Sequence, residues 1–192
     1  FLKNSKLSIS GDVDFQNGFG LNVQGKVDLS DIGKIADFPI MGEGNLRWSI
    51  VGKKPNVQLI FEPELKNAHY LFLNLGDVTG KIIWEDGPEI LKFENLIAIQ
   101  GRTKLLANGQ VELGDNESLN IDVQVPNGTV QDFAQIFLKF INENIPWYPQ
   151  NMIGQLTGLI EVRGKPDLDE LWAGGNFEVR DLEYLNEVIR YA

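Results

Sequence analysis

Apolar and polar residues alternate along much of this chain, and this two-residue period constrains the fold more than any other feature. Residues 21–29 and 119–125 place their apolar residues at odd positions and their polar residues at even positions, and shorter runs cover 7–9, 46–50 and 111–113. Successive side chains of a strand point to opposite faces, so each run predicts a strand with one apolar and one solvated face. Strands of a parallel sheet covered on both faces would be continuously apolar. The sequence therefore predicts a mainly β protein built on an antiparallel sheet.

Clusters of Asn, Asp, Gly and Pro separate the alternating runs. They occur at residues 16–18, 85–88, 114–116 and 126–128. These residue types favour turns, because they tolerate positive φ or fix φ near −65°. Turns at such intervals between alternating runs predict hairpins joined into a long meander.

One segment, at about 129–143, has helical instead of two-residue spacing. Thr129, followed three residues later by Asp132, resembles a capping box with Asp in place of Glu or Gln. Prolines at 146 and 149 end the pattern, and a shorter helical turn is expected over 30–35. We expect the longer segment to be an amphipathic helix that covers part of the apolar face of the sheet. Its apolar residues include Phe133, Phe137 and Phe140.

A short sequence near residue 50 is repeated near residue 162, and the pattern of residues around it is repeated as well. Gly42 and Gly52 enclose a ten-residue interval followed by Lys-Lys-Pro, and Gly154 and Gly164 enclose an equal interval followed by Lys-Pro. Downstream, residues 67–71 parallel residues 181–185. The spacing predicts two weakly similar modules, at about 21–110 and 111–192, within one elongated unit covering 1–192.

Composition removes several classes of function. The formal net charge of −10 argues against nucleic-acid binding, which needs clustered Lys and Arg. The chain has no Cys and a single His, His69, so a zinc site or a Ser-His-Asp triad has no basis. We therefore expect no catalytic residues, no metal and no cofactor. Because the chain opens on Phe1 without an initiator Met, we also expect a segment of a longer protein.

Two stretches resemble the AsmA-like proteins of the TamB type. These are "VQGKVDLSDIGKI" at 23–35 and "GQLTGLIEVRGKPDLDELWAGGNFEVRDLEYL" at 154–185. The resemblance lies in the pattern of strand, Pro-containing turn and strand, together with the twofold module, and it spans most of the chain. It implies a curled sheet with an apolar groove, called a β-taco, in a long protein of the Gram-negative periplasm that is anchored in the inner membrane. It further implies phospholipid transport between the two membranes and support for outer-membrane protein assembly with a barrel partner of the TamA type.

An apolar trough of this kind would shelter acyl chains at about 0.8 kcal/mol for each buried methylene. A lipid gains the same benefit inside a membrane, so net transfer would be close to neutral, as a conduit requires. The residues expected to line the trough are Val23, Val27, Leu29, Leu46, Trp48, Ile50, Val111, Leu113, Ile121, Val123, Ile160 and Val162.

Two other interpretations fit the alternation. The apolar face can be the dry core of an adhesin or scaffold module that binds partners on its outer surface. A β-jellyroll of the kind that transports lipopolysaccharide shares the groove, but it usually lacks an inserted helix.

Overall fold

A computed structural model describes residues 4–14, 18–31, 40–71, 73–113, 117–144, 151–165, 170–184 and 187–191. These residues form eleven strands in one sheet, together with the helices α2 (Val130–Ile136) and α3 (Leu138–Asn144). The strands are β1 (Lys6–Asp14), β2 (Gly18–Asp28), β3 (Ile40–Lys53), β4 (Asn56–Tyr70), β5 (Leu73–Glu85), β6 (Ile90–Gln100), β7 (Thr103–Glu112), β8 (Ser118–Thr129), β9 (Ile153–Gly164), β10 (Leu171–Tyr184) and β11 (Glu187–Tyr191).

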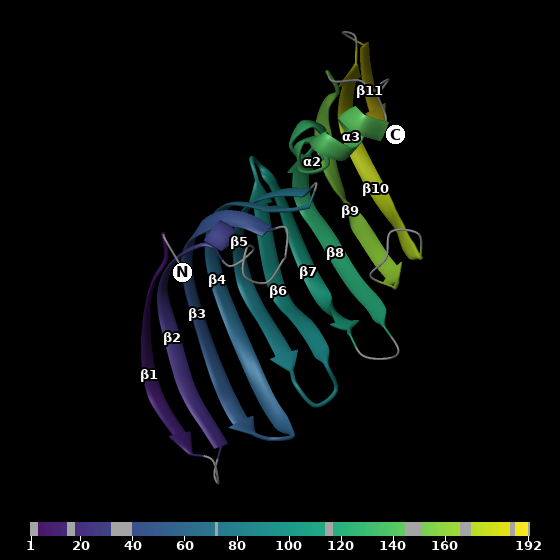
Figure 1. Cartoon of the computed structure of the whole chain (residues 1–192). Helices are drawn as coiled ribbons and strands as arrows, with labels where there is room; N and C mark the ends of the chain where they lie inside the picture. The colour runs from purple at the N-terminus through teal and green to yellow at the C-terminus, as the bar shows by residue number, and fades with distance from the viewer. Residues whose placement is uncertain are drawn as a thin grey trace.

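The strands lie in the sheet in the order in which they occur along the chain, and every neighbouring pair is antiparallel. β1 and β11 therefore form the two edges of one elongated, curled sheet, with the chain termini at opposite ends (Figure 1). The predicted antiparallel meander is confirmed. Its turns connect neighbours in space, as short connections between alternating strands require. The turn predicted at 126–128 is wrong, because these residues lie within β8.

The helical segment differs from the single helix predicted at about 129–143. α2 and α3 are seven residues each and are separated at Phe137, which has φ −105° and ψ 12°. The Phe137 N–H donates to the Ala134 carbonyl at 3.1 Å, a tightened i to i−3 bond that ends the first helix. Thr129 is the N-cap as predicted, and its hydroxyl accepts from the Asp132 N–H at 3.2 Å. The shorter turn is helical at residues 29–31, and its remaining residues lie outside the described ones.

β-Bulges recur from strand to strand near one end of the strands. This is called the helix-bearing end, because α2 follows β8 there. Register shifts occur in seven successive strand pairings, from β3–β4 to β9–β10. Asn67, Asn95 and Asp181, each at such a shift, have φ of 50°, 49° and 51°. Asn and Asp tolerate this left-handed conformation better than other non-glycine residues. Because a bulge bends and twists its strand, this series accounts for the curl of the sheet.

The residues aligned by the sequence repeat occupy equivalent positions in the sheet. β3 pairs with β2 and β4, and β9 pairs with β8 and β10, and each of the two strands follows a helical segment. Gly42 of β3 lies opposite the bulge at Asn67, and Gly154 of β9 lies opposite the bulge at Asp181. A Cβ atom at either glycine would lie 3.0–3.4 Å from partner-strand atoms. The similarity therefore marks equivalent strands that bend against equivalent bulges.

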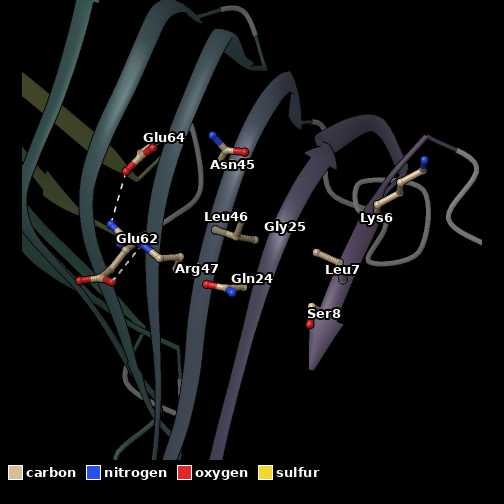
Figure 2. Close-up of a pocket in the computed structure, with 10 residues that line it drawn as sticks. All are labelled: Lys6, Leu7, Ser8, Gln24, Gly25, Asn45, Leu46, Arg47, Glu62 and Glu64. Carbon is tan, nitrogen blue, oxygen red and sulfur yellow. Dashed lines mark hydrogen bonds and ion pairs between the residues drawn. The ribbon is translucent and has the colours of Figure 1, made fainter. Parts of the chain in front are cut away.

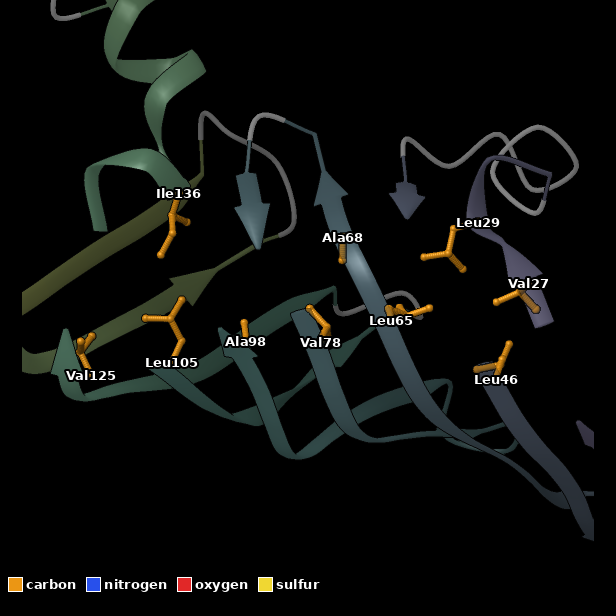
Figure 3. Packing of buried hydrophobic residues seen from close by; sticks show 10 residues of the cluster. All are labelled: Val27, Leu29, Leu46, Leu65, Ala68, Val78, Ala98, Leu105, Val125 and Ile136. Atoms are coloured by element: carbon orange, nitrogen blue, oxygen red, sulfur yellow. The ribbon is translucent and has the colours of Figure 1, made fainter. Parts of the chain in front are cut away.

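Buried hydrophobic side chains collect at the helix-bearing end. Ile136 of α2 is 1% exposed and packs with residues from β2 to β8 in one cluster (Figure 3). α2 therefore covers the part of this cluster that lies on β5, β6 and β8. Its buried members are Val27, Leu29, Leu46, Leu65, Ala68, Val78, Ala98, Leu105, Val125 and Ile136.

Candidate functional site

Two rows of apolar residues cross the sheet on the face that carries the core. In each row, every residue is the register partner of the next, so all of them share one face. The first apolar row is Ile9, Val23, Trp48, Phe61, Ile82, Phe93, Gly109, Ile121, Val162 and Ala173. The second apolar row is Gly11, Leu21, Ile50, Leu59, Trp84, Leu91, Val111, Leu119, Gly164 and Leu171. Each row runs through ten strands, from β1 to β10.

Most large side chains of these rows are only half-buried. Val23 and Val111 are buried, whereas Trp48, Phe61, Ile82, Phe93 and the others of β3 to β8 keep part of their surface exposed. A second layer of described residues covers this face only at the helix-bearing end. The two rows therefore form a continuous apolar surface that, away from that end, no second layer of the described residues covers as in a packed sheet.

The opposite face is largely polar. Residues between the two rows in sequence pair across this face, as Asn22 does with Ser49 and Asn120 does with Gln110 and Arg163. Apolar residues also occur on this face, because Ile60 pairs there with Ile83, which is buried, and Ile97 pairs there with Leu106. The contrast between the faces is what the alternation predicts.

All the predicted lining residues except Leu113 fall into three groups. Six of them, Val23, Trp48, Ile50, Val111, Ile121 and Val162, lie in the two apolar rows. Val123 and Ile160 are partners of each other on the same face, and Val123 packs against the core. Val27, Leu29 and Leu46 belong to the buried core at the helix-bearing end.

Leu113 lies apart from the other predicted lining residues. It follows the last residue of β7, and 41% of its surface is exposed. Its N–H donates to the Glu89 carbonyl at 3.0 Å, so its backbone belongs to a connection between hairpins. The structure places Leu113 beyond the strand that carries Val111.

Sequence reasoning missed the central part of the apolar face. Phe61, Ile82, Trp84, Leu91 and Phe93 occupy the rows in β4, β5 and β6. These strands also carry isoleucines on the polar face, so apolar residues occur at consecutive positions and the alternation is blurred. The register between strands, which the sequence alone does not reveal, identifies the face.

The helical segment covers one end of the apolar face. The rings of Phe133 and Phe137 are 5.3 Å apart, and Phe133 also meets Phe177 of β10 at 5.3 Å. Phe133 and Phe137 pack against the core, as predicted, whereas the side chain of Phe140 lies outside the described ones. α2 contacts β5, β6, β8 and β9.

Trp48 has a polar atom that the apolar face does not satisfy. Its ring packs edge-on against Phe61, with centroids 5.9 Å apart and planes at 82°. Its buried Nε1 has no hydrogen-bond partner among the described residues. Burying an unpaired indole N–H costs about 1–3 kcal/mol. The ring is therefore held by apolar packing alone.

A shallow depression of about 550 Å³ lies on the side of β1 to β4 that carries Gln24, Arg47 and Glu62 (Figure 2). The Arg47 guanidinium lines it and lies 3.8 Å from the Glu62 carboxylate and 3.3 Å from the Glu64 carboxylate. The three charged side chains are about half exposed, so these pairs contribute little to stability. With Arg47, Glu62 and Glu64 paired within the sheet, this depression is a weaker candidate for a site than the apolar face.

Metal-ligating side chains do not cluster in the part of the chain that the structure describes. No group of three or more His, Cys, Asp and Glu side chains there could hold a metal ion. His69 Nδ1 contacts the Asn67 carbonyl at 2.9 Å. Burial raises the pKa of Tyr70, the last residue of β4.

Among the described residues, no helix combines the length and the hydropathy needed to cross a membrane. Searches against protein-family models, curated proteins and solved structures found no match to this chain.

Proposed function

We propose that the apolar face holds the acyl chains of phospholipids while their headgroups remain in water. The observation that carries this proposal is the pair of apolar rows, most of whose large side chains in β3 to β8 keep part of their surface exposed. A dry core would leave side chains of this size almost fully buried. Acyl chains supply the missing apolar layer without requiring any polar contact.

The direction of the rows supports movement along the sheet. Neighbouring strands lie about 4.8 Å apart, so ten strands carry each row over roughly 40 Å. This exceeds the roughly 15 Å thickness of one leaflet's hydrocarbon region. A lipid therefore covers part of a row at a time. Because successive positions are all apolar, it can shift from strand to strand without leaving an apolar surface.

The chain fits a segment of a TamB/AsmA-like bridge that crosses the periplasm from an inner-membrane anchor. In this role it passes phospholipid between the inner and outer membranes and supports assembly of outer-membrane proteins, with any barrel partner of the TamA type bound by other parts of the protein. The curled antiparallel sheet and its one-sided apolar surface support this assignment, together with the two stretches that resemble the family.

A pair of adjacent substitutions tests lipid binding. Ile121→Asp puts a carboxylate in the first apolar row, and Asn120→Asp puts the same group on the polar face one residue earlier. We expect Ile121→Asp to reduce uptake of a fluorescent phospholipid from vesicles at least fivefold. Asn120→Asp should retain uptake within about twofold, because its side chain is exposed to water already.

The fold of both variants is checked by circular dichroism and urea unfolding. If both variants are folded and take up lipid equally, the apolar face is not the binding surface. A folded wild-type chain that takes up no lipid would support a dry adhesin or scaffold module instead.

A further inference from the structure

Four residues hold the start of α2 to the sheet, and we call them the α2 clamp. The Arg102 N–H, in the turn before β7, donates to the Asp132 carboxylate at 2.6 Å. The Thr129 N–H donates to Oγ1 of Thr103, the first residue of β7, at 3.0 Å. One carboxylate and one hydroxyl therefore join the start of a helix to the start of a strand.

The same arrangement occurs a second time, between the start of β1 and the helical residues 29–31. The Asn4 N–H donates to the Asp31 carboxylate at 2.8 Å. The Asp28 N–H, at the end of β2, donates to Ser5 Oγ at 3.0 Å. In both clamps an N–H before a strand binds an Asp of the helix start, and an N–H at the end of the next strand binds a hydroxyl. The two clamps lie six strands apart, at β1 and β7, so the attachment is a repeated part of the fold.

Beyond its clamp, α2 lies on the face of the sheet that carries the two apolar rows. Val125 follows Ile121 by four residues in β8, so both side chains point to this face. Ile121 belongs to the first apolar row, whereas Val125 is buried in the core together with Leu105 and with Ile136 of α2 (Figure 3). The core is therefore the covered part of the same apolar face, and α2 supplies its cover there.

The boundary between the covered and the open part of this face lies at Phe177. This residue of β10 is the partner of Gly158, which is the partner of Val125, so Phe177 shares their face. Its ring meets that of Phe133 of α2 at 5.3 Å, yet 42% of its surface is exposed. Phe177 is therefore in contact with α2 on one side and with solvent on the other.

We propose that the α2 clamp holds α2 as a side wall of the acyl-chain groove, so that lipid reaches the apolar rows and is kept off the core. This inference rests on the proposed function, because a wall acts only on a ligand that occupies the groove. α2 and an acyl chain would each bury the same apolar surface, so the hydrogen bonds of the clamp decide between them. Asp132 is thus a positioning residue, which acts on lipid through α2.

Removing the carboxylate of the clamp tests this role. Asp132→Ala deletes the acceptor of the Arg102 N–H, whereas Asp132→Asn, the matched control, keeps an oxygen that can accept the same bond. The bond is exposed to solvent, so the sheet should stay folded without it, as circular dichroism would verify. Thr103→Val breaks the other bond of the clamp and replaces Asp132→Ala in the test if that variant does not fold.

A photoreactive phenylalanine analogue in place of Phe177 reports what lies against this position. Each protein is irradiated with vesicles of phosphatidylethanolamine and phosphatidylglycerol, and its adducts are identified by mass spectrometry. In the wild-type chain we expect cross-links mainly to α2. Asp132→Ala should give about fivefold more lipid adduct, the change in population that the loss of one hydrogen bond produces. Asp132→Asn should stay within about twofold of the wild-type adduct.

The same analogue in place of Phe93, in the first apolar row, separates this inference from the proposed function. Lipid captured at 93, with equal lipid adducts at 177 in the wild-type chain and in the folded clamp variant, would overturn the side wall alone. A loss of α2 cross-links in Asp132→Asn as large as in Asp132→Ala would also overturn it. No lipid at 93 in the wild-type chain would overturn the proposed function, and the side wall with it.

Discussion

At the scale of single residues, the left-handed bulge positions are the points on which the bend of the sheet depends. The Asn95 N–H, displaced from the regular strand pattern, is bound by the Asn108 side-chain oxygen of β7 at 2.8 Å. A side chain thus replaces the missing strand partner. An amide at this position stabilises a bend instead of merely tolerating it.

Removing that side-chain acceptor should weaken the fold by a modest amount. We predict that Asn108→Ala lowers the free energy of unfolding by about 0.5–1 kcal/mol, because water replaces part of the lost bond at this exposed site. Urea unfolding measures the change, and Asn120→Ala, another Asn of the polar face, is the control. If Asn108→Ala costs no more than Asn120→Ala, the bond does not stabilise the bulge.

Sequence reasoning succeeded for residues whose faces alternate and failed where both faces are apolar. Val23, Ile121 and Val162 could be assigned from their own strands, whereas Phe61, Ile82 and Phe93 could not, because Ile60 and Ile83 interrupt the pattern beside them. The bulges at Asn67 and Asp181 were marked only as part of a repeat. Their left-handed conformation depends on the partner strand, which a single segment does not specify.

At the scale of elements, a buried hydroxyl links the start of α2 to the sheet. Thr103 of β7 is fully buried, and its Oγ1 accepts from the Thr129 N–H at 3.0 Å and donates to the Thr129 carbonyl at 3.3 Å. Thr129 in turn caps α2, and the Asp132 carboxylate accepts from the Arg102 N–H at 2.6 Å. The start of the helix is therefore tied to β7 and to the turn before it.

Loss of this hydroxyl should loosen the helix that covers part of the core. We predict that Thr103→Val, which keeps the side-chain shape, lowers the free energy of unfolding by about 1–3 kcal/mol because the Thr129 N–H is left unpaired. Thr103→Ser keeps the hydroxyl and should cost less. Hydrogen exchange at residues 133–136 should rise more in the Val variant, and equal exchange in the two variants would contradict this anchoring.

The helix was predictable in place and capping, but its division into two was not. Thr129 and the Phe spacing mark its beginning and its apolar face, whereas Phe137 has no Gly or Pro signal that would announce a break. Phe137 leaves the helical conformation while its ring packs on Phe133 and the core. Tertiary packing therefore overrides local preference at this position.

At the scale of the whole molecule, one-sided alternation leads to an open sheet, and the bulges give that sheet its curl. The order of the strands follows from short turns between alternating runs, so the meander could be predicted. The extent of the uncovered apolar face could not be predicted, because it depends on how little of the sheet α2 and α3 reach. That uncovered face is the basis of the proposed function.

The most direct test of this account is photo-crosslinking from two neighbouring positions of β3 in the chain exported to a Gram-negative periplasm, followed by lipid mass spectrometry. Ile50 lies in the second apolar row, and Ser49 lies on the polar face with a similar, half-buried side chain. A photoreactive residue at Ile50 should capture phospholipid, and one at Ser49 should capture little. Absence of lipid at Ile50, or equal capture at both positions, would contradict the claim that the apolar face holds acyl chains.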